Sequence, residues 1–229
     1  MATKTTVKSK KQAKAAQRKG WRPSATQIAV AVAVAIGLGL LFAVYTVTQN
    51  EKQTTASAEG SSGYNFAVGD PGPGETAPPF TLPATNGEQV SLADYGGQNV
   101  LLYFHEGGGC QPCWDQIADV EDAWADFEAA GIDAFLPVTT DPIDLHTQKM
   151  AADGLSTVAV SDTDLAVSEQ YDTNAYGMMR GTTNGHSFIL VDGEGTIVWR
   201  ADYGGEPDYT MYLPVDAILT DLEADRIDQ

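Results

Sequence analysis

The sequence predicts an α/β protein in which helices cover the faces of a mixed sheet. Between residues 99 and 171, apolar runs of strand length alternate with stretches of helical periodicity, a pattern typical of parallel strands joined by helices. Residues 187–200 contain two apolar runs around a Gly-rich turn, which indicates an antiparallel hairpin, and a helix-like segment ends the chain. Parallel units followed by a hairpin predict the mixed sheet.

The predicted domain opens with a hairpin, a short helical turn and a buried strand. Asn86-Gly87 is a strong turn signal between the strand-like runs 80–82 and 88–91. Residues 92–95 are expected to form a helical turn, and the apolar run 99–104 is expected to be the first central strand. This strand leads directly into the loop that carries the cysteines.

A long amphipathic helix is expected next, over residues 114–130. Ile117, Val120, Trp124 and Phe127 recur there at spacings of three and four, which places them on one face of a helix. The remaining elements are expected in this order: a strand at 132–138, a helix at 142–153, a strand at 157–160, a helix at 164–171, a loop at 173–185, strands at 187–191 and 196–200, and a helix at 213–227.

Charge divides the chain into a basic tip and an acidic body. Residues 1–50 contain eight basic and no acidic side chains, whereas residues 51–229 contain five basic and 31 acidic ones. A strongly acidic body is soluble and repels polyanions, which disfavours nucleic acid as a partner. Residues 107–109 lack the Lys and Ser/Thr of a phosphate-binding loop, which argues against nucleotide chemistry at this Gly-rich loop.

An uncharged apolar run follows the basic tip. Residues 28–47 are long enough to span the roughly 30 Å hydrocarbon core as a helix, and bases flank only their N-terminal side, which favours a cytoplasmic N-terminus. A cleaved signal peptide is the alternative, since residues 54–58 offer a weak cleavage site. The chain is expected to divide into a basic cytoplasmic tail at 1–25, a transmembrane helix at 26–48, a flexible linker at 49–74 and an extracytoplasmic domain at 75–229.

The two cysteines of the chain form one motif, Cys110-Gln-Pro-Cys113, between the first central strand and the long helix. A thiolate at a helix N-terminus is stabilised by free backbone N–H groups and by the helix dipole, which lowers the thiol pKa. Cys110 is therefore the expected nucleophile and Cys113 the resolving thiol of a redox-active disulfide. Pro112 suits the first helical turn, where no N–H is needed.

A purely structural disulfide is the competing interpretation, because exported cysteines are usually paired. A ring closed over so few residues restrains the unfolded chain little, so it stabilises poorly. A third interpretation is a metal site, because thiolates and imidazoles are ligands of copper and zinc.

The motif and its surroundings resemble the redoxin, or AhpC/TSA, branch of the thioredoxin fold. The resemblance covers about residues 74–205 and rests on the Cys-x-Pro-Cys motif, on Gly74-Glu-Thr-Ala-Pro-Pro-Phe-Thr-Leu-Pro83 and on Phe188-Ile-Leu-Val-Asp192. It implies a thioredoxin-like three-layer sandwich with a mixed central sheet. The branch contains peroxiredoxins and membrane-anchored thiol–disulfide reductases of the TlpA/ResA type. Copper-binding SCO proteins share the fold and bind copper with two cysteines and a histidine just before a late strand, a segment that residues 185–192 resemble. This resemblance implies Cys110, Cys113 and His186 as copper ligands, with His105 as a fourth ligand if the metal is zinc.

The chain departs from each of these groups at identifiable positions. Peroxiredoxins carry a proline and a Thr or Ser before the reactive cysteine, where this chain has Tyr103 and Gly107. The reductases carry a Trp before the first cysteine and a cis-proline before a late strand, where this chain has Gly109 and then Gly185 or His186. SCO cysteines are one residue further apart than Cys110 and Cys113.

His105 and Glu106, next to the motif, are candidates for moving protons to and from Cys113, because a buried thiol must ionise before it attacks. His186 is a candidate pocket residue. The prediction is a membrane-anchored thiol–disulfide oxidoreductase that needs no cofactor. Its expected partner is an extracytoplasmic thiol or disulfide protein, or a small thiol or peroxide. The alternatives are a copper-binding chaperone and a thiol peroxidase.

Overall fold

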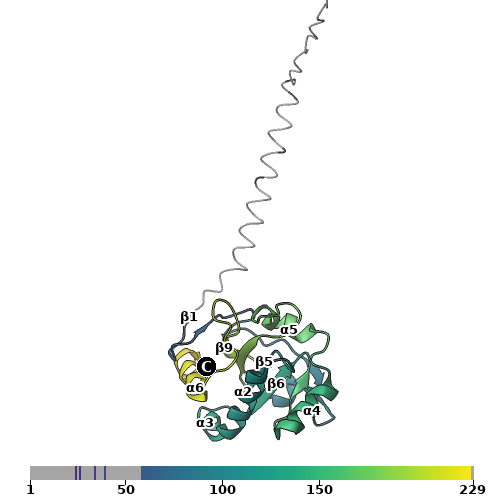
Figure 1. Ribbon diagram of the computed structural model, residues 1–229. Coiled ribbons are helices and arrows are strands. Elements are labelled where there is room, and N and C mark those ends of the chain that lie inside the picture. Colours follow the sequence, from purple (N-terminus) through teal and green to yellow (C-terminus); the bar gives the residue numbers. More distant parts are fainter. Residues whose placement is uncertain (1–23, 25, 27–33, 35–38, 40–57, 228–229) are drawn as a thin grey trace, which may run out of the picture. The chain divides into compact units, whose positions relative to one another are not determined.

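The computed structural model has a central sheet of five strands in the order β7-β6-β5-β8-β9. Figure 1 labels three of these strands, β5, β6 and β9. Strand β5 pairs in parallel with β6, and β6 with β7, whereas β5/β8 and β8/β9 are antiparallel. The sheet is therefore mixed, as the sequence predicts. Its strands are β5 (Val100–His105), β6 (Ala134–Thr139), β7 (Val160–Ser161), β8 (His186–Val191) and β9 (Ile197–Asp202).

The structure describes residues 24, 26, 34, 39 and 58–227. The continuous range belongs to one compact unit that begins at Thr55. Within the described residues, no helix has the length and apolar character needed to cross a membrane. Apart from the four isolated positions, the expected tail at 1–25 and transmembrane helix at 26–48 lie outside the described residues.

Because side chains alternate along each strand, the two faces of the sheet pack into two separate hydrophobic cores. Leu101, Tyr103 and Phe188 belong to the core that the larger helices cover, and Leu102 and Phe104 belong to the other. The first core contains side chains of α2 (Gln111–Asp122), α3 (Trp124–Ala129), α4 (Ile143–Asp153) and α6 (Val215–Asp225). The second contains side chains of β3 (Thr81–Pro83), β4 (Gln89–Ser91) and α5 (Ala166–Gln170). These contacts form the expected three layers.

The smaller expected elements are also present. Strands β3 and β4 pair antiparallel, so the Asn-Gly hairpin is confirmed. Two short 3₁₀ helices occur, η1 (Leu92–Tyr95), which is the predicted helical turn, and η2 (Thr173–Ala175), which lies in the predicted loop. Ser91 caps η1: its side chain accepts the Ala93 N–H, and Asp94 accepts the Ser91 N–H.

Two elements differ from the prediction for local reasons. The helix expected at 114–130 begins at Gln111 and is interrupted at Ala123, whose N–H is shared between the carbonyls of Asp119 and Glu121. The strand expected at 157–160 is observed as β7, which is shorter and begins later in the chain, at Val160. The Glu121 carboxylate accepts the N–H groups of Ser156 and Thr157 at 2.9 and 2.6 Å, which diverts this backbone from strand pairing.

Residues 58–74, part of the segment expected to be a flexible linker, pack on the domain. Strands β1 (Ala58–Glu59) and β2 (Asn65–Phe66) form a small hairpin, and Phe66 enters the core. The buried Asp221 carboxylate of α6 accepts the Ser62 N–H at 2.7 Å and the Ser62 hydroxyl at 2.6 Å. Composition indicated flexibility here, but these long-range contacts order the segment.

All three histidines of the chain, His105, His146 and His186, are fully buried. Burial removes the hydration of an imidazolium ion and so lowers the histidine pKa. It lowers the pKa of His105 well below the usual 6.5, that of His146 to about 4 and that of His186 to about 3. All three rings are therefore neutral at pH 7.

Stability should fall on mild acidification because of these rings. Unfolded histidines titrate near 6.5, so between pH 6.5 and about 4 the unfolded chain binds more protons than the folded one. We expect the free energy of unfolding to decrease from pH 7.5 to pH 5.5 by roughly 1 kcal/mol per histidine. Urea denaturation across this range measures it, and His146→Phe should show a smaller decrease. A constant or rising free energy of unfolding would contradict the prediction.

Candidate active site

The two cysteines lie where β5 ends and α2 begins. Cys110 is the N-cap of α2 and Cys113 lies in its first turn, joined to Cys110 by a disulfide with Cα atoms 5.3 Å apart. Cys110 retains 6% of its surface and Cys113 none. Pro112 occupies the first turn, as expected, and is exposed together with Gln111. Both cysteines are thus buried, but only Cys110 keeps a small exposed surface.

The position of Cys110 favours its ionised form. The Cys113 N–H donates to the Cys110 sulfur at 3.3 Å, and the helix dipole places partial positive charge at the same point. Both interactions stabilise a thiolate relative to a thiol. A nucleophilic sulfur at the surface end of α2 is therefore chemically consistent with its surroundings.

The loop before Cys110 is organised around the backbone N–H and carbonyl of Gly107. Its N–H donates to His105 Nδ1 at 3.2 Å, while its carbonyl accepts from Trp114 Nε1 and from the Cys110 N–H, both at 3.0 Å. Gly107 has a positive φ of 83°, and a Cβ there would lie 2.4 Å from side-chain oxygens of Asp141 and Thr139. Only glycine fits this position without rearrangement.

Asp141, which follows β6, supports the same loop from the neighbouring strand. Its carboxylate accepts the Gly108 N–H at 2.5 Å. Its own N–H donates to the Thr139 hydroxyl at 3.3 Å. The sequence analysis missed Asp141. The carboxyl ends of parallel neighbouring strands meet at one sheet edge, and that rule would have indicated the side chain.

Behind the loop, three rings pack edge to face. The ring centres of His105 and Trp114 are 5.2 Å apart, those of Trp114 and His146 are 5.5 Å apart, and those of His105 and His146 are 5.9 Å apart. His146 comes from α4, and its Nδ1 lies 3.3 Å from the Ser161 hydroxyl. Sequence reasoning did not single out His146, since only the tertiary fold places α4 against this loop.

His186 lies beside this cluster, at the start of β8. It is the strand partner of His105, and its Nδ1 is 2.9 Å from the Tyr103 hydroxyl. That hydroxyl also lies 3.4 Å from the Cys113 carbonyl. His186 is thus brought to the dithiol region, but as a buried ring linked through Tyr103 and not as an exposed pocket wall.

Glu106 connects the cysteine loop to the segment before β8. Its carboxylate accepts the Met178 N–H at 3.1 Å, and the side chains of Met178 and Met179 are 62% and 59% exposed. At Gly185, a Cβ would lie 1.1 Å from the Tyr176 carbonyl oxygen. The Gly185 backbone therefore lies directly against that of Tyr176, which leaves no room for a side chain at this position.

The residues suggested for copper do not form a ligand set here. Among the described residues, no group of three or more His, Cys, Asp or Glu side chains is arranged to hold a metal ion. Both cysteine sulfurs are engaged in the disulfide, and His186 Nδ1 faces Tyr103. The structure thus lends no support to the ligand set Cys110, Cys113 and His186.

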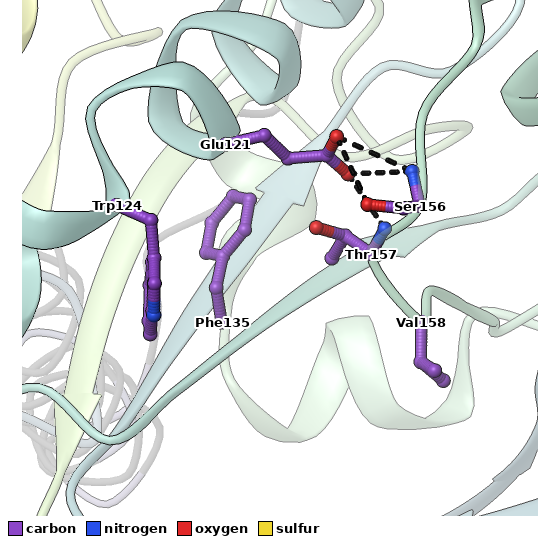
Figure 2. Close-up of a pocket in the computed structure, with 6 residues that line it drawn as sticks. All are labelled: Glu121, Trp124, Phe135, Ser156, Thr157 and Val158. Carbon is purple, nitrogen blue, oxygen red and sulfur yellow. Dashed lines mark hydrogen bonds between the residues drawn. The ribbon is translucent and has the colours of Figure 1, made fainter.

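A cavity of about 390 Å³ lies away from the dithiol, at the far end of α2 (Figure 2). Glu121 is in the twelve-residue α2, eleven positions after Cys110, which corresponds to roughly 16 Å along a helix. Figure 2 shows its carboxylate directed at the backbone of Ser156 and Thr157. This carboxylate holds the loop before β7, and the cavity is separate from the cysteine site. Its other lining residues are Trp124, Phe135 and Val158.

Several known proteins resemble this chain. Escherichia coli peroxiredoxin Bcp is 33% identical over 127 residues, which cover 54% of this chain and 81% of that protein. Bacillus subtilis thiol-disulfide oxidoreductase ResA is 31% identical over 102 residues, covering 44% of this chain and 56% of that protein. The crystal structure of peroxidoxin BcpB from Mycobacterium tuberculosis matches with a TM-score of 0.55 and 18% identity, covering 68% of this chain and 98% of that one.

The structural match supports the thioredoxin-like fold that the sequence resemblance implied. The model of the AhpC/TSA family matches residues 73–200, more than half of the chain and including the Cys110–Cys113 motif. The chain therefore belongs to the AhpC/TSA family of redoxins, whose members among its relatives are thiol–disulfide oxidoreductases and peroxiredoxins.

Proposed function

We propose that the protein is a membrane-anchored thiol–disulfide oxidoreductase that works on the extracytoplasmic side through Cys110 and Cys113. The observation that carries the proposal is the disulfide at the start of α2, in which Cys110 keeps 6% of its surface exposed and Cys113 none. This asymmetry suits an attacking and a resolving thiol. The family membership and the similarity to ResA support the same chemistry.

The proposed reaction transfers two electrons from the Cys110–Cys113 dithiol to a partner disulfide. The Cys110 thiolate attacks a partner disulfide, forming a mixed disulfide and releasing one partner thiolate. The Cys113 thiol then loses its proton and attacks the Cys110 sulfur. This step closes the Cys110–Cys113 disulfide and releases the second partner thiolate. The reverse sequence oxidises a partner dithiol. Proton transfer by His105 or Glu106 stays a prediction.

The membrane part of the proposal rests on sequence. The uncharged run at 28–47 has the length of a membrane span, and basic residues flank only its N-terminal side. This arrangement supports a domain outside the cytoplasm, where its partner would be a thiol or disulfide protein.

Single substitutions distinguish the roles of the two cysteines. Reduced Cys113→Ser should form a stable mixed disulfide with oxidised glutathione, because no second thiol is present to resolve it. Reduced wild type should proceed to the internal disulfide, and Cys110→Ser should react at least about tenfold more slowly, since Cys113 is buried. Mass spectrometry of quenched samples distinguishes the products. Equal reactivity of both single variants would contradict the assigned roles.

A thiol peroxidase is the second candidate, favoured by the 33% identity to peroxiredoxin Bcp. Tyr103 and Gly107 replace the family's proline and hydroxyl residue, Tyr103 is buried, and the peptide groups of Gly107 are already hydrogen-bonded. We therefore expect reduced protein to react with hydrogen peroxide no faster than a free thiol with the same thiolate fraction. Stopped-flow measurement of Trp fluorescence tests this. A rate more than about a hundredfold higher would establish the peroxidase instead.

The membrane location has its own test. In cells that express the full chain, the protein should stay with the membrane pellet after alkaline carbonate extraction. In spheroplasts, external protease should degrade the domain while cytoplasmic proteins survive. Replacing three residues of the run 28–47 by Asp should release the protein from the pellet, because each buried charge is costly. Recovery of the wild-type chain in the soluble fraction would refute the anchor.

A further inference from the structure

The hydrogen bonds around His105 determine where its ring proton lies. Nδ1 accepts the Gly107 N–H at 3.2 Å, so Nδ1 carries a lone pair. Burial keeps the ring neutral at pH 7. A neutral imidazole has one N–H, and the hydrogen must therefore be on Nε2.

This Nε2–H is a buried donor without an acceptor. No partner for it exists among the described residues, and the same holds for Nε2 of His146 and of His186. Unpaired buried polar atoms are unfavourable and uncommon. Here three of them belong to histidine rings that surround the cysteine loop, with His105 in contact with His146 directly and with His186 through Tyr103.

When the disulfide of this loop is reduced, its sulfur atoms become stronger hydrogen-bond acceptors. The sulfurs of a disulfide accept hydrogen bonds weakly, whereas a thiolate accepts them strongly. His105 is joined to the cysteine loop at two points: its Nδ1 accepts the N–H of Gly107, whose carbonyl accepts the Cys110 N–H, and its ring contacts Trp114, the residue after Cys113. Reduction would thus create a strong acceptor in the loop that the ring of this unsatisfied donor supports.

We infer that His105 Nε2–H donates to the reduced cysteine pair and stabilises it, so that the pair is a stronger oxidant than the same motif without this donor. A disulfide whose reduced form is stabilised has a higher reduction potential. His146 and Trp114 hold the donor ring in place by their edge-to-face contacts. The inference rests on the proposed function only in taking the Cys110–Cys113 pair as redox-active.

The measured equilibrium is the exchange of the protein disulfide with glutathione. The Cys110–Cys113 bond accepts two electrons and breaks, while two glutathione thiols lose two electrons and form one disulfide bond. Of the two protons that the glutathione thiols release, one binds Cys113 and the other goes to solvent when Cys110 remains a thiolate. The ratio of oxidised to reduced protein at fixed glutathione composition gives the equilibrium constant.

Two variants separate the donor from the rest of the ring. His105→Asn keeps an acceptor at the position of Nδ1 for the Gly107 N–H but has no group at the position of Nε2. His105→Gln places an amide N–H at the ε position. His105→Asn should shift the equilibrium about tenfold toward the oxidised form, equivalent to about 30 mV, and His105→Gln should stay within about threefold of wild type.

A second readout excludes a merely structural effect. The pH dependence of Cys110 alkylation by iodoacetamide should move upward by about one pH unit in His105→Asn and little in His105→Gln. Both variants must show the wild-type near-UV circular dichroism. An unchanged equilibrium in His105→Asn, or equal shifts in both variants, would overturn the inference and leave the proposed function standing. A wild-type disulfide that does not exchange with glutathione at all would end both.

Discussion

The cysteine site depends on the backbone of one residue, Gly107. Its N–H donates to His105, and its carbonyl accepts from Trp114 and from the Cys110 N–H, so a strand residue, a helix residue and Cys110 are all joined to the two polar backbone groups of Gly107. The close approach of Asp141 leaves no room for a side chain. Because the loop is fixed by backbone hydrogen bonds, Cys110 reaches the start of α2 in one defined position.

Neutral aromatic packing lies directly beneath this loop. The domain carries a large excess of acidic residues, yet the rings of His105, His146 and His186 are buried and uncharged near the dithiol. A low-dielectric interior strengthens the local dipoles that act on a sulfur. The helix dipole and the hydrogen bonds at Cys110 therefore act on the pair in a largely uncharged surrounding.

The features shared with the family and the differences from its motifs lie in different parts of the molecule. The match to the AhpC/TSA family covers most of the sheet and helices α2 to α5, whereas α6 lies beyond it. The departures at Tyr103, at Gly107 and at Gly185 or His186 each coincide with a local contact. Tyr103 bonds to His186, Gly107 meets Asp141, and Gly185 approaches the backbone of Tyr176. The chain thus shares its fold with the family, but differs from its relatives in the residues around the cysteines.

The sequence by itself determined the alternation of strands and helices, the hairpins and the position of the Cys110–Cys113 pair at a helix start, since these follow from local periodicity and turn chemistry. Only the tertiary structure decided that residues 58–74 join the domain, that His146 and Asp141 support the cysteine loop, and that His105 keeps an unpaired N–H. These features join residues far apart in the chain, and such contacts leave no local pattern in the sequence.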